Sequence, residues 1–312
     1  MTITILLGDV REQLKTLEDE SVHTVVTSPP YFGLRDYGMP GQIGLEPSPA
    51  AFVEVMVEVF REVRRVLRSD GTLWLNLGDS YANDGKWGGS TGGKHASALH
   101  GDSGIGRRKL STGMKPKDLM GVPWRVAFAL QADGWYLRQD IIWSKPNPMP
   151  ESVTDRCTKA HEYLFLLSKS GRYYFDVDAI AEKAACPDGP GNTKPYDIPG
   201  QRSGENSNLG GSTHKIGARE TRNKRSVWTV ATQPFKEAHF ATFPPALIEP
   251  CILAGSPKGG VILDPFGGAG TTGLVADRLG RDAVLIELNP DYAEIARKRI
   301  RGDAPLFATV AA

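Results

Sequence analysis

Cysteine is scarce in this chain of 312 residues, which contains only Cys157, Cys186 and Cys251. None of them has Cys-x-x-Cys spacing, so the common zinc sites and disulfide frameworks are excluded. No apolar run approaches the roughly 20 residues that span a bilayer, and the apolar N-terminus lacks the basic flank of a signal peptide. We therefore expect a cytoplasmic protein with no metal centre and no membrane contact.

An excess of charge of either sign is also absent. Lys and Arg number 37 and Asp and Glu number 36, so the net charge of +1 indicates no particular partner. A surface for a polyanion must therefore come from local clusters of basic residues. With 40% hydrophobic residues, a chain of this length can bury the core of one large α/β domain with insertions, or of two smaller domains.

Apolar residues recur with strand or helix periods along most of the chain. The alternation of strands and helices, clearest in the last third, predicts a mainly parallel sheet covered by helices. The predicted strands are Ile3–Leu7, Val22–Thr27, Thr72–Leu77, Gln139–Trp143, Glu162–Ser168 with Arg172–Phe175 as its antiparallel partner, Val261–Leu263 and Ala283–Glu287. The predicted helices are Pro49–Arg68, Pro123–Ala132, a helix ending at Ala254, Thr271–Leu279 and Pro290–Arg301. Two stretches rich in Gly and Ser, Asn83–Lys117 and Ala185–Arg225, interrupt this pattern and predict insertions on one scaffold.

A glycine-rich turn, Asp264-Pro-Phe-Gly-Gly-Ala-Gly-Thr-Thr272, joins a predicted strand to a predicted helix. Its glycines allow the backbone to approach a ligand, and the free N–H groups of the helix, with Thr271 and Thr272 as caps, attract an anion. Glu287 ends the next strand, about 20 residues later, where an acidic residue holds ribose hydroxyls in nucleotide sites. A plain strand–helix connection is the alternative, but the added Glu287 favours a nucleotide-like cofactor. Neither Gly-Lys-Ser/Thr nor Gly-x-Gly-x-x-Gly occurs here, which disfavours phosphate-loop and dinucleotide sites.

A second motif, Ser28-Pro29-Pro30-Tyr31, follows the predicted strand Val22–Thr27. The proline pair has fixed φ angles, so it holds the Ser28 hydroxyl and the Pro29 carbonyl as two acceptors beside an aromatic ring. On its own the motif is more typical of a turn that ends a strand than of a catalytic site. Its significance comes from the presence of the glycine-rich turn in the same chain.

These two motifs resemble those of the DNA amino-methyltransferases, which carry (Asp/Asn/Ser)-Pro-Pro-(Tyr/Phe/Trp) and an Asp-Pro-Phe-x-Gly-x-Gly-type turn. Because the Pro-Pro motif precedes the glycine-rich turn, the chain resembles the permuted β group of that family. Further segments that resemble the family are Gly8-Asp9, Gly71–Asp79, Trp143–Asn147, Glu162–Phe165 and His239–Pro244. The resemblance implies a Rossmann-like methyltransferase fold, with a mainly parallel sheet, an antiparallel hairpin and helices on both faces, and S-adenosyl-L-methionine as the methyl donor.

The resemblance also implies a division of the chain and the roles of its residues. Residues 1–184 form the catalytic part with a flexible insertion at 83–117, residues 185–235 a target-recognition insertion, and residues 236–312 the cofactor-binding part of the same domain. The cofactor residues are then Asp9, Asp264, Pro265, Phe266, Gly268, Gly270, Thr271, Thr272 and Glu287. The catalytic residues are Ser28, Pro29, Pro30 and Tyr31.

The catalytic residues suit methylation of an exocyclic base amine, whose lone pair is delocalised into the ring. Acceptors on Ser28 and Pro29 draw the nitrogen toward tetrahedral geometry, and Tyr31 stacks on a base that has left the duplex. Ser28 in the first position resembles enzymes that methylate cytosine at N4, while adenine-N6 enzymes more often have Asp, so adenine stays the alternative. Methylation of cytosine at C5 needs a nucleophilic cysteine, but Cys251 lies in an apolar stretch and is predicted to be a buried helical residue.

Clusters of basic residues predict contacts with double-stranded DNA. The cluster in the recognition insertion consists of Lys215, Arg219, Arg222, Lys224 and Arg225, and we also assign Arg35 and Lys145 beside the catalytic motifs to DNA. A weaker cluster contains Arg107, Arg108, Lys109, Lys115 and Lys117. A solvated surface is the alternative for any one of these residues.

The sequence thus predicts a site-specific DNA methyltransferase of the kind found in restriction–modification. It leaves open whether the protein forms a homodimer and whether a restriction enzyme accompanies it. The competing hypotheses are methylation of an amine on RNA or protein, and a DNA-binding module with a vestigial cofactor fold.

Overall fold

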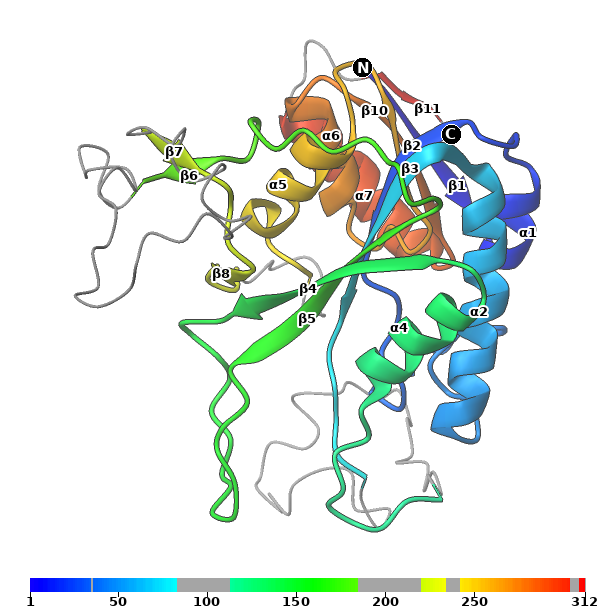
Figure 1. Cartoon of the computed structure of the whole chain (residues 1–312). Coiled ribbons are helices and arrows are strands. Elements are labelled where there is room, and N and C mark those ends of the chain that lie inside the picture. Colours follow the sequence, from blue (N-terminus) through cyan, green and yellow to red (C-terminus); the bar gives the residue numbers. More distant parts are fainter. Residues whose placement is uncertain (35, 83–112, 185–219, 234–241, 304–308, 312) are drawn as a thin grey trace, which may run out of the picture. The chain divides into compact units, whose positions relative to one another are not determined.

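The computed structural model describes residues 1–34, 36–82, 113–184, 220–233, 242–303 and 309–311 (Figure 1). The chain forms two compact units, one of Met1–Phe175 with Ser226–Ala312 and the other of Asp176–Arg225. The second unit overlaps the predicted recognition insertion 185–235, although it starts and ends earlier. Of the predicted insertion 83–117, only residues 113–117 lie within the described part.

A mostly parallel sheet forms the centre of the first unit. In the described part of the chain its strand order is β11-β1-β10-β9-β2-β3-β5-β4-β8. Neighbouring strands are parallel except that β5 runs antiparallel to both β3 and β4. The strands are β1 (Thr2–Leu7), β2 (Val22–Thr27), β3 (Leu67–Leu77), β4 (Tyr136–Ser144), β5 (His161–Ser168), β8 (Val227–Thr229), β9 (Val261–Asp264), β10 (Asp282–Glu287) and β11 (Thr309–Ala311).

Helices cover both faces of this sheet, as predicted (Figure 1). One face carries α1 (Val10–Lys15), α2 (Pro49–Val66) and α4 (Val122–Ala132), and the other carries α5 (Pro245–Gly255), α6 (Thr271–Arg278) and α7 (Pro290–Asp303). The long helix α2 begins at Ser48, whose hydroxyl accepts a hydrogen bond from the Ala51 N–H at 3.2 Å. Its apolar residues Phe52, Met56 and Phe60 share one stripe and are fully buried, which fixes α2 against the sheet.

The strand order reverses between β9 and β2, and this reversal brings the two sequence motifs together. Val25 of β2 lies opposite Leu263 of the parallel strand β9. Because β1, β2, β9 and β10 are parallel, their carboxyl ends meet at one edge of the sheet. Open α/β sheets bind ligands in the crevice beyond the carboxyl ends of the strands, at the place where the strand order reverses.

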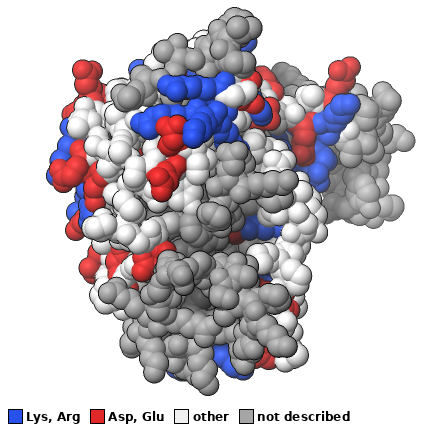
Figure 2. Space-filling model, turned by 180° about the vertical axis from the view of Figure 1, so that it is seen from behind, with Lys and Arg blue, Asp and Glu red and all other residues white. Residues whose placement is uncertain are grey.

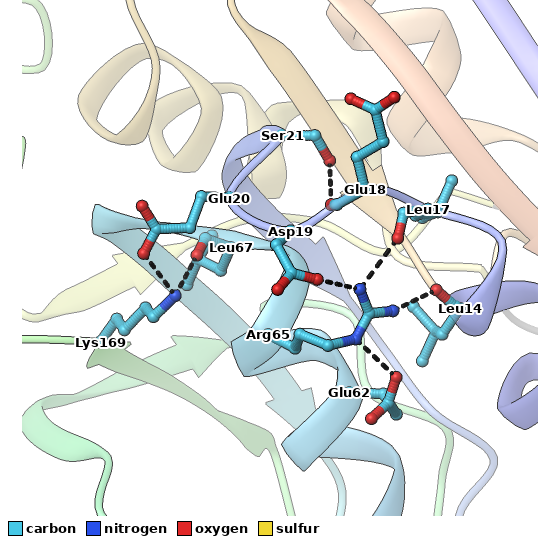
Figure 3. A network of polar contacts seen from close by, with 10 residues as sticks. All are labelled: Leu14, Leu17, Glu18, Asp19, Glu20, Ser21, Glu62, Arg65, Leu67 and Lys169. Carbon is cyan, nitrogen blue, oxygen red and sulfur yellow. Dashed lines mark hydrogen bonds and ion pairs between the residues drawn. The ribbon is translucent and has the colours of Figure 1, made fainter.

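Arg65, near the end of α2, fastens the segment that leads into β2 (Figure 3). Its guanidinium donates to the carbonyls of Leu14 and Leu17 at 2.8 and 2.9 Å, and it pairs with Asp19 at 2.5 Å and Glu62 at 2.9 Å. These bonds satisfy two carbonyls at the end of α1. They therefore help to fix where β2 begins.

Nearby, Lys169 donates to the Leu67 carbonyl at 2.6 Å and pairs with Glu20 at 3.1 Å (Figure 3). This side chain links the residue after β5 to the first residue of β3. The contact joins the neighbouring strands β3 and β5 at the end of the sheet opposite to the two motifs.

Two of the predicted elements are wrong in detail. The helix predicted to reach Arg68 ends at Val66, because Leu67 has an extended backbone (ψ 136°) and pairs with Val22 as the start of β3. The predicted strand Arg172–Phe175 does not form. The strand β5 already has β3 and β4 on its two edges, so no edge is left for it.

The second unit contains a short antiparallel pair, β6 (Glu182–Lys183) and β7 (Thr221–Arg222). Glu182 accepts hydrogen bonds from Arg222 at 3.0 Å and from Arg225 at 2.7 Å. None of the described helices in either unit has the length and hydropathy needed to cross a membrane.

Candidate active site

A cleft of about 190 Å³ opens at the carboxyl ends of β1, β2, β9 and β10. Both motifs line it: Ser28 and Pro30 from one, and Asp264 to Ala269 with Thr271 from the other. Asp9 and Glu287 complete the polar wall. Residues from opposite ends of the chain therefore share one cavity, as the two motifs predicted.

Asp264 joins the two motifs through hydrogen bonds. It is buried, with 1% of its surface exposed. Its Oδ1 accepts from Thr27 Oγ1 at 2.6 Å and from the Phe266 N–H at 3.0 Å, and its Oδ2 accepts from Thr272 Oγ1 at 2.6 Å. Burial raises the pKa of Asp264 to about 6, although these hydrogen bonds favour the ionised form. The carboxylate is thus occupied by donors from β2, the turn and α6, so it holds the glycine-rich turn in place.

The glycine-rich turn leads into α6 without a side-chain cap, so the predicted capping by Thr271 and Thr272 is wrong. Gly270 is the N-cap residue, with φ +76°, and a Cβ there would come within 2.8 Å of Ala296 on α7. Thr272 cannot cap because its hydroxyl donates to Asp264, and Thr271 Oγ1 instead accepts from Arg299 at 2.9 Å. The N–H groups of the first turn of α6 consequently have no side-chain cap.

Glu287 and Asp9 bring two carboxylates to the cleft. Glu287 Oε2 accepts from the Gly268 N–H at 2.8 Å and Oε1 from the Asn289 N–H at 2.8 Å, while burial raises its pKa. Asp9 caps α1 by accepting from the Arg11 N–H at 2.8 Å, and its bond with the Arg11 guanidinium lowers its pKa. Glu287 is therefore bonded directly to the turn, at a glycine whose φ is +50°.

Tyr31 is held firmly at the catalytic motif. Its hydroxyl donates to Glu162 Oε2 at 2.7 Å and accepts from Asn76 Nδ2 at 2.7 Å, and Ser28 Oγ lies 3.5 Å away. Burial raises the pKa of Tyr31 well above 10, which keeps the phenol neutral. The ring packs on Gly78, where a Cβ would come within 2.5 Å of it. Pro29 is buried and is not among the residues that line the cleft, although its neighbours Ser28 and Pro30 are.

Asn76, Glu162 and Lys145 form a polar network around Tyr31 that the sequence did not reveal. Asn76 Nδ2 also donates to Glu162 Oε2 at 2.9 Å, and Lys145 pairs with Glu162 Oε1. The Lys145 ammonium lies 4.2 Å from the centroid of the Trp143 ring, and its side chain is 17% exposed. Lys145, predicted to contact DNA, thus has its partners inside the protein. Lys145 and Glu162 belong to segments that resemble the family, but no spacing indicated that Glu162 bonds to Tyr31 or that Lys145 pairs with Glu162.

Only some of the residues that were predicted to contact DNA lie in the described part of the chain, and two of these, Arg222 and Arg225, both pair with Glu182. Arg222, Lys224 and Arg225 belong to the second unit, while Arg35, Lys215 and Arg219 lie outside the described residues. In the weaker cluster, Lys115 and Lys117 pair with Asp118 and Asp155, and Arg107, Arg108 and Lys109 are outside the described part. Figure 2 shows Lys and Arg interspersed with Asp and Glu over the described part of one face.

The lining of the cleft fits S-adenosyl-L-methionine. The turn and the first turn of α6 offer backbone N–H groups to a carboxylate. Glu287 and Asp9 suit ribose hydroxyls, and Phe266, Ile286 and Tyr292 provide an apolar wall for a base. Cys251, in contrast, is buried in α5 with its thiol 3.6 Å from the Leu247 carbonyl, so the cleft contains no cysteine nucleophile among its described lining residues.

The DNA methylase family of N6/N4 methyltransferases matches residues 22–298 of this chain. The chain is 47% identical over 296 residues to the type II methyltransferase M.SmaI of Serratia marcescens, covering 95% of this chain and 90% of that protein. It is 45% identical over 312 residues to M.Cfr9I of Citrobacter freundii, covering 99% and 91%.

Solved structures agree with this result. A putative DNA modification methylase from Thermus thermophilus, complexed with S-adenosyl-L-methionine, is 26% identical, with a TM-score of 0.60 and coverage of 99% and 100%. The cytosine-N4-specific PvuII DNA methyltransferase shares the fold at 19% identity, with a TM-score of 0.63 and coverage of 96% and 87%. The resemblance inferred from the two motifs is therefore confirmed, and so is the predicted fold class. The chain belongs to the N6/N4 DNA methylase family and is a site-specific DNA methyltransferase whose cofactor is S-adenosyl-L-methionine.

Proposed function

We propose that this enzyme methylates the exocyclic N4 amine of a cytosine that has turned out of double-stranded DNA. The observation that carries the proposal is the shared cleft, in which Ser28 lies beside the glycine-rich turn that receives the cofactor. Serine as the first residue of the motif favours cytosine over adenine. Methylation of adenine at N6 is the second candidate, because the family includes both activities.

The motif Ser28-Pro29-Pro30-Tyr31, which we call the catalytic corner, activates the amine by accepting hydrogen bonds from its N–H groups. The bound cofactor supplies an electrophilic methyl group on a positively charged sulfur. Ser28 Oγ accepts a hydrogen bond from one N4 hydrogen. The carbonyl of Pro29, a buried residue between the two cleft residues Ser28 and Pro30, accepts the other, which localises the lone pair on nitrogen. The ring of Tyr31 stacks on the base, and its bonds to Glu162 and Asn76 keep the ring in one orientation. The N4 nitrogen would form its bond to the methyl group as the bond from that group to sulfur breaks, leaving a thioether, and N4 would then release one proton. A single displacement of this kind does not require a cysteine nucleophile.

The proposed cofactor residues divide into those that contact the ligand and those that hold the turn. Glu287 and Asp9 bind the ribose, Phe266 packs against the adenine, and Gly268 presents its backbone. Pro265 lines the same wall, whereas Gly270, Thr272 and Asp264 act through the geometry of the turn and α6. Thr271 lines the cleft and is oriented by Arg299.

The recognition of a specific sequence is assigned to the insertion 185–235. Its basic residues Lys215, Arg219, Arg222, Lys224 and Arg225 bind phosphates and base edges, as does Arg35 from the catalytic side.

M.SmaI and M.Cfr9I are named type II methyltransferases, which supports a role as the modification enzyme beside a restriction endonuclease in the cytoplasm. Light scattering on the purified protein decides between a monomer and a homodimer.

Nucleoside analysis tests the proposed base. Duplex DNA is incubated with the enzyme and cofactor carrying a deuterated methyl group, digested to nucleosides and analysed by mass spectrometry. We expect deuterated N4-methyldeoxycytidine. Detection of deuterated N6-methyldeoxyadenosine instead would mean that adenine is the target base of the same mechanism. Detection of 5-methyldeoxycytidine would contradict the mechanism itself.

A further inference from the structure

The loop between β4 and β5, residues 145–160, extends away from the sheet as a long finger (Figure 1). Its first arm starts at Lys145 and its second arm ends at Ala160. The two arms are paired where they leave the sheet, since the Lys145 N–H donates to the Ala160 carbonyl at 2.8 Å. The segment Pro148-Met149-Pro150 lies in the first half of this loop. Met149 is 86% exposed, which is the largest value among the large hydrophobic residues of the described part.

Contacts along both arms attach this loop to the rest of the first unit. On the first arm, Asn147 bonds to the backbone of Thr232 at 2.9 and 3.2 Å. On the second arm, Arg156 pairs with Glu151 at 2.6 Å and lies 4.0 Å from the centroid of the Tyr81 ring. Since both arms are held, the exposure of Met149 is built into the loop.

The second arm is also fastened close to β3. Lys159 donates to the Asp79 carbonyl at 3.0 Å, and Asp79 accepts from the N–H of Val122 at the start of α4 at 3.1 Å. The base of the loop is therefore part of the folded core of the first unit.

The loop starts at the catalytic corner. Lys145, its first residue, pairs with Glu162, and Glu162 accepts the hydrogen bond of the Tyr31 hydroxyl. The finger and the ring that stacks on the target base therefore share one polar network. Because β5 runs antiparallel to both β3 and β4, and β2 is parallel to β3, β4 ends at the same end of the sheet as β2. The loop therefore leaves the sheet on the side from which a duplex delivers a base to Tyr31.

We propose that Met149 enters the duplex beside the target cytosine and packs against the base step that opens when the cytosine leaves. The proposal rests on the proposed function, because only a base that turns out of the helix leaves such a step. Proteins that unstack DNA insert apolar side chains such as Met and Pro between bases. A thioether adapts to an irregular gap, and the two flanking prolines restrict the backbone that carries it.

The test compares Met149→Ala with the unmodified enzyme on two substrates. One is a duplex with the methylated sequence, identified by sequencing DNA that the enzyme has modified, and the other has an abasic site opposite the target base. We expect Met149→Ala to lower kcat/KM on the paired duplex by about 10-fold, since burial of the Met side chain is lost. On the abasic duplex, the loss should shrink to about 2-fold or less, because the target base there has no pairing partner to leave.

Two further variants serve as controls. Met149→Leu keeps the apolar volume and should retain most of the activity, while Thr158→Ala alters an exposed residue on the second arm and should leave both substrates unaffected. Fluorescence of 2-aminopurine beside the target should rise on binding to the unmodified enzyme and rise less with Met149→Ala. Equal activity of Met149→Ala and the unmodified enzyme on the paired duplex would overturn the proposal, as would an equal loss on both substrates. Methylation of adenine would change the proposed base and leave this test valid, so the two failures are distinguishable.

Discussion

The hydroxyl of Thr27 donates a hydrogen bond of 2.6 Å to Oδ1 of Asp264, which joins the last residue of β2 to the last residue of β9. The catalytic motif starts directly after Thr27, and the glycine-rich turn starts at Asp264. This one bond therefore couples the segment that handles the base to the segment that holds the cofactor. Both residues are buried, so water does not replace the bond if it is lost.

We predict that Thr27→Val lowers the free energy of unfolding by about 2 kcal/mol, because a bond to a buried charged group is lost while the shape is kept. Denaturant unfolding of both proteins measures the difference. Thr16→Val is the matched control, since the Thr16 hydroxyl bonds to the Gln13 carbonyl at the surface and its loss should change stability by less than about 0.5 kcal/mol. A Thr27→Val protein as stable as the unmodified enzyme would contradict the role of this bond.

The raised pKa of Asp264 predicts how stability depends on pH. The folded protein holds this proton up to about pH 6, whereas an unfolded Asp releases it near 3.8. The folded state thus binds more protons between these values, and the contribution of Asp264 to stability falls by about 3 kcal/mol in total as the pH rises from below 3.8 to above 6. The free energy of unfolding of the unmodified enzyme and of Asp264→Asn is measured across pH 4 to 7, and the difference between the two proteins at each pH isolates this change. Glu287 must be considered in the comparison, because its pKa is raised mainly by burial and also by the charge on Asp264. A difference that stays constant with pH would contradict the prediction.

Much of this arrangement could be predicted from the sequence because it depends on local patterns. The bounds of β2 were predicted without error, and the glycine-rich turn lies between a strand and a helix as its residues indicated. The shared cleft follows from parallel strands, whose carboxyl ends meet at one edge. Contacts between distant segments could not be predicted in this way. The hydroxyl of Tyr31 bonds to Asn76 of β3 and Glu162 of β5, and Lys145 after β4 pairs with Glu162. Their meeting depends on the register of an antiparallel strand whose partner was assigned wrongly.

The sequence also did not predict the conformation at the start of α6. A threonine pair after glycine is typical of an N-cap, but Thr272 bonds to Asp264, and Thr271 bonds to Arg299 on α7. Packing of α7 against Gly270 decides this geometry, and only the folded chain reveals it. Tertiary contacts thus override a local capping preference.

Tyr31→Ala should reduce turnover by about 10- to 100-fold, because stacking of a base on an aromatic ring is worth ~1–3 kcal/mol. The affinity for the cofactor should change by less than about 2-fold, since Tyr31 does not line the cleft. Tyr31→Phe keeps the ring but loses the bonds to Glu162 and Asn76, so we expect an intermediate loss. Steady-state kinetics and calorimetry measure the two quantities. Equal losses in turnover and cofactor affinity would contradict the placement of Tyr31 over the base.

Glu287→Ala should weaken cofactor binding by about 30-fold, or ~2 kcal/mol, because a charged acceptor of hydrogen bonds is removed and the Gly268 N–H loses its partner. Isothermal calorimetry with S-adenosyl-L-methionine measures the change. Glu294→Ala, an exposed carboxylate on α7, should leave the affinity unchanged. An undiminished affinity of Glu287→Ala would remove Glu287 from the cofactor site.

The most direct test of the central claim, that Ser28 and the glycine-rich turn act in one cleft, is the rate of methyl transfer in a single turnover. Ser28→Ala and the unmodified enzyme are first saturated with cofactor and DNA, so that binding no longer limits the reaction. We predict that Ser28→Ala lowers this rate by at least ~100-fold, as removal of one preorganised group at a reacting centre does, with the affinity for the cofactor retained. An unchanged rate in the saturated complex would contradict the account.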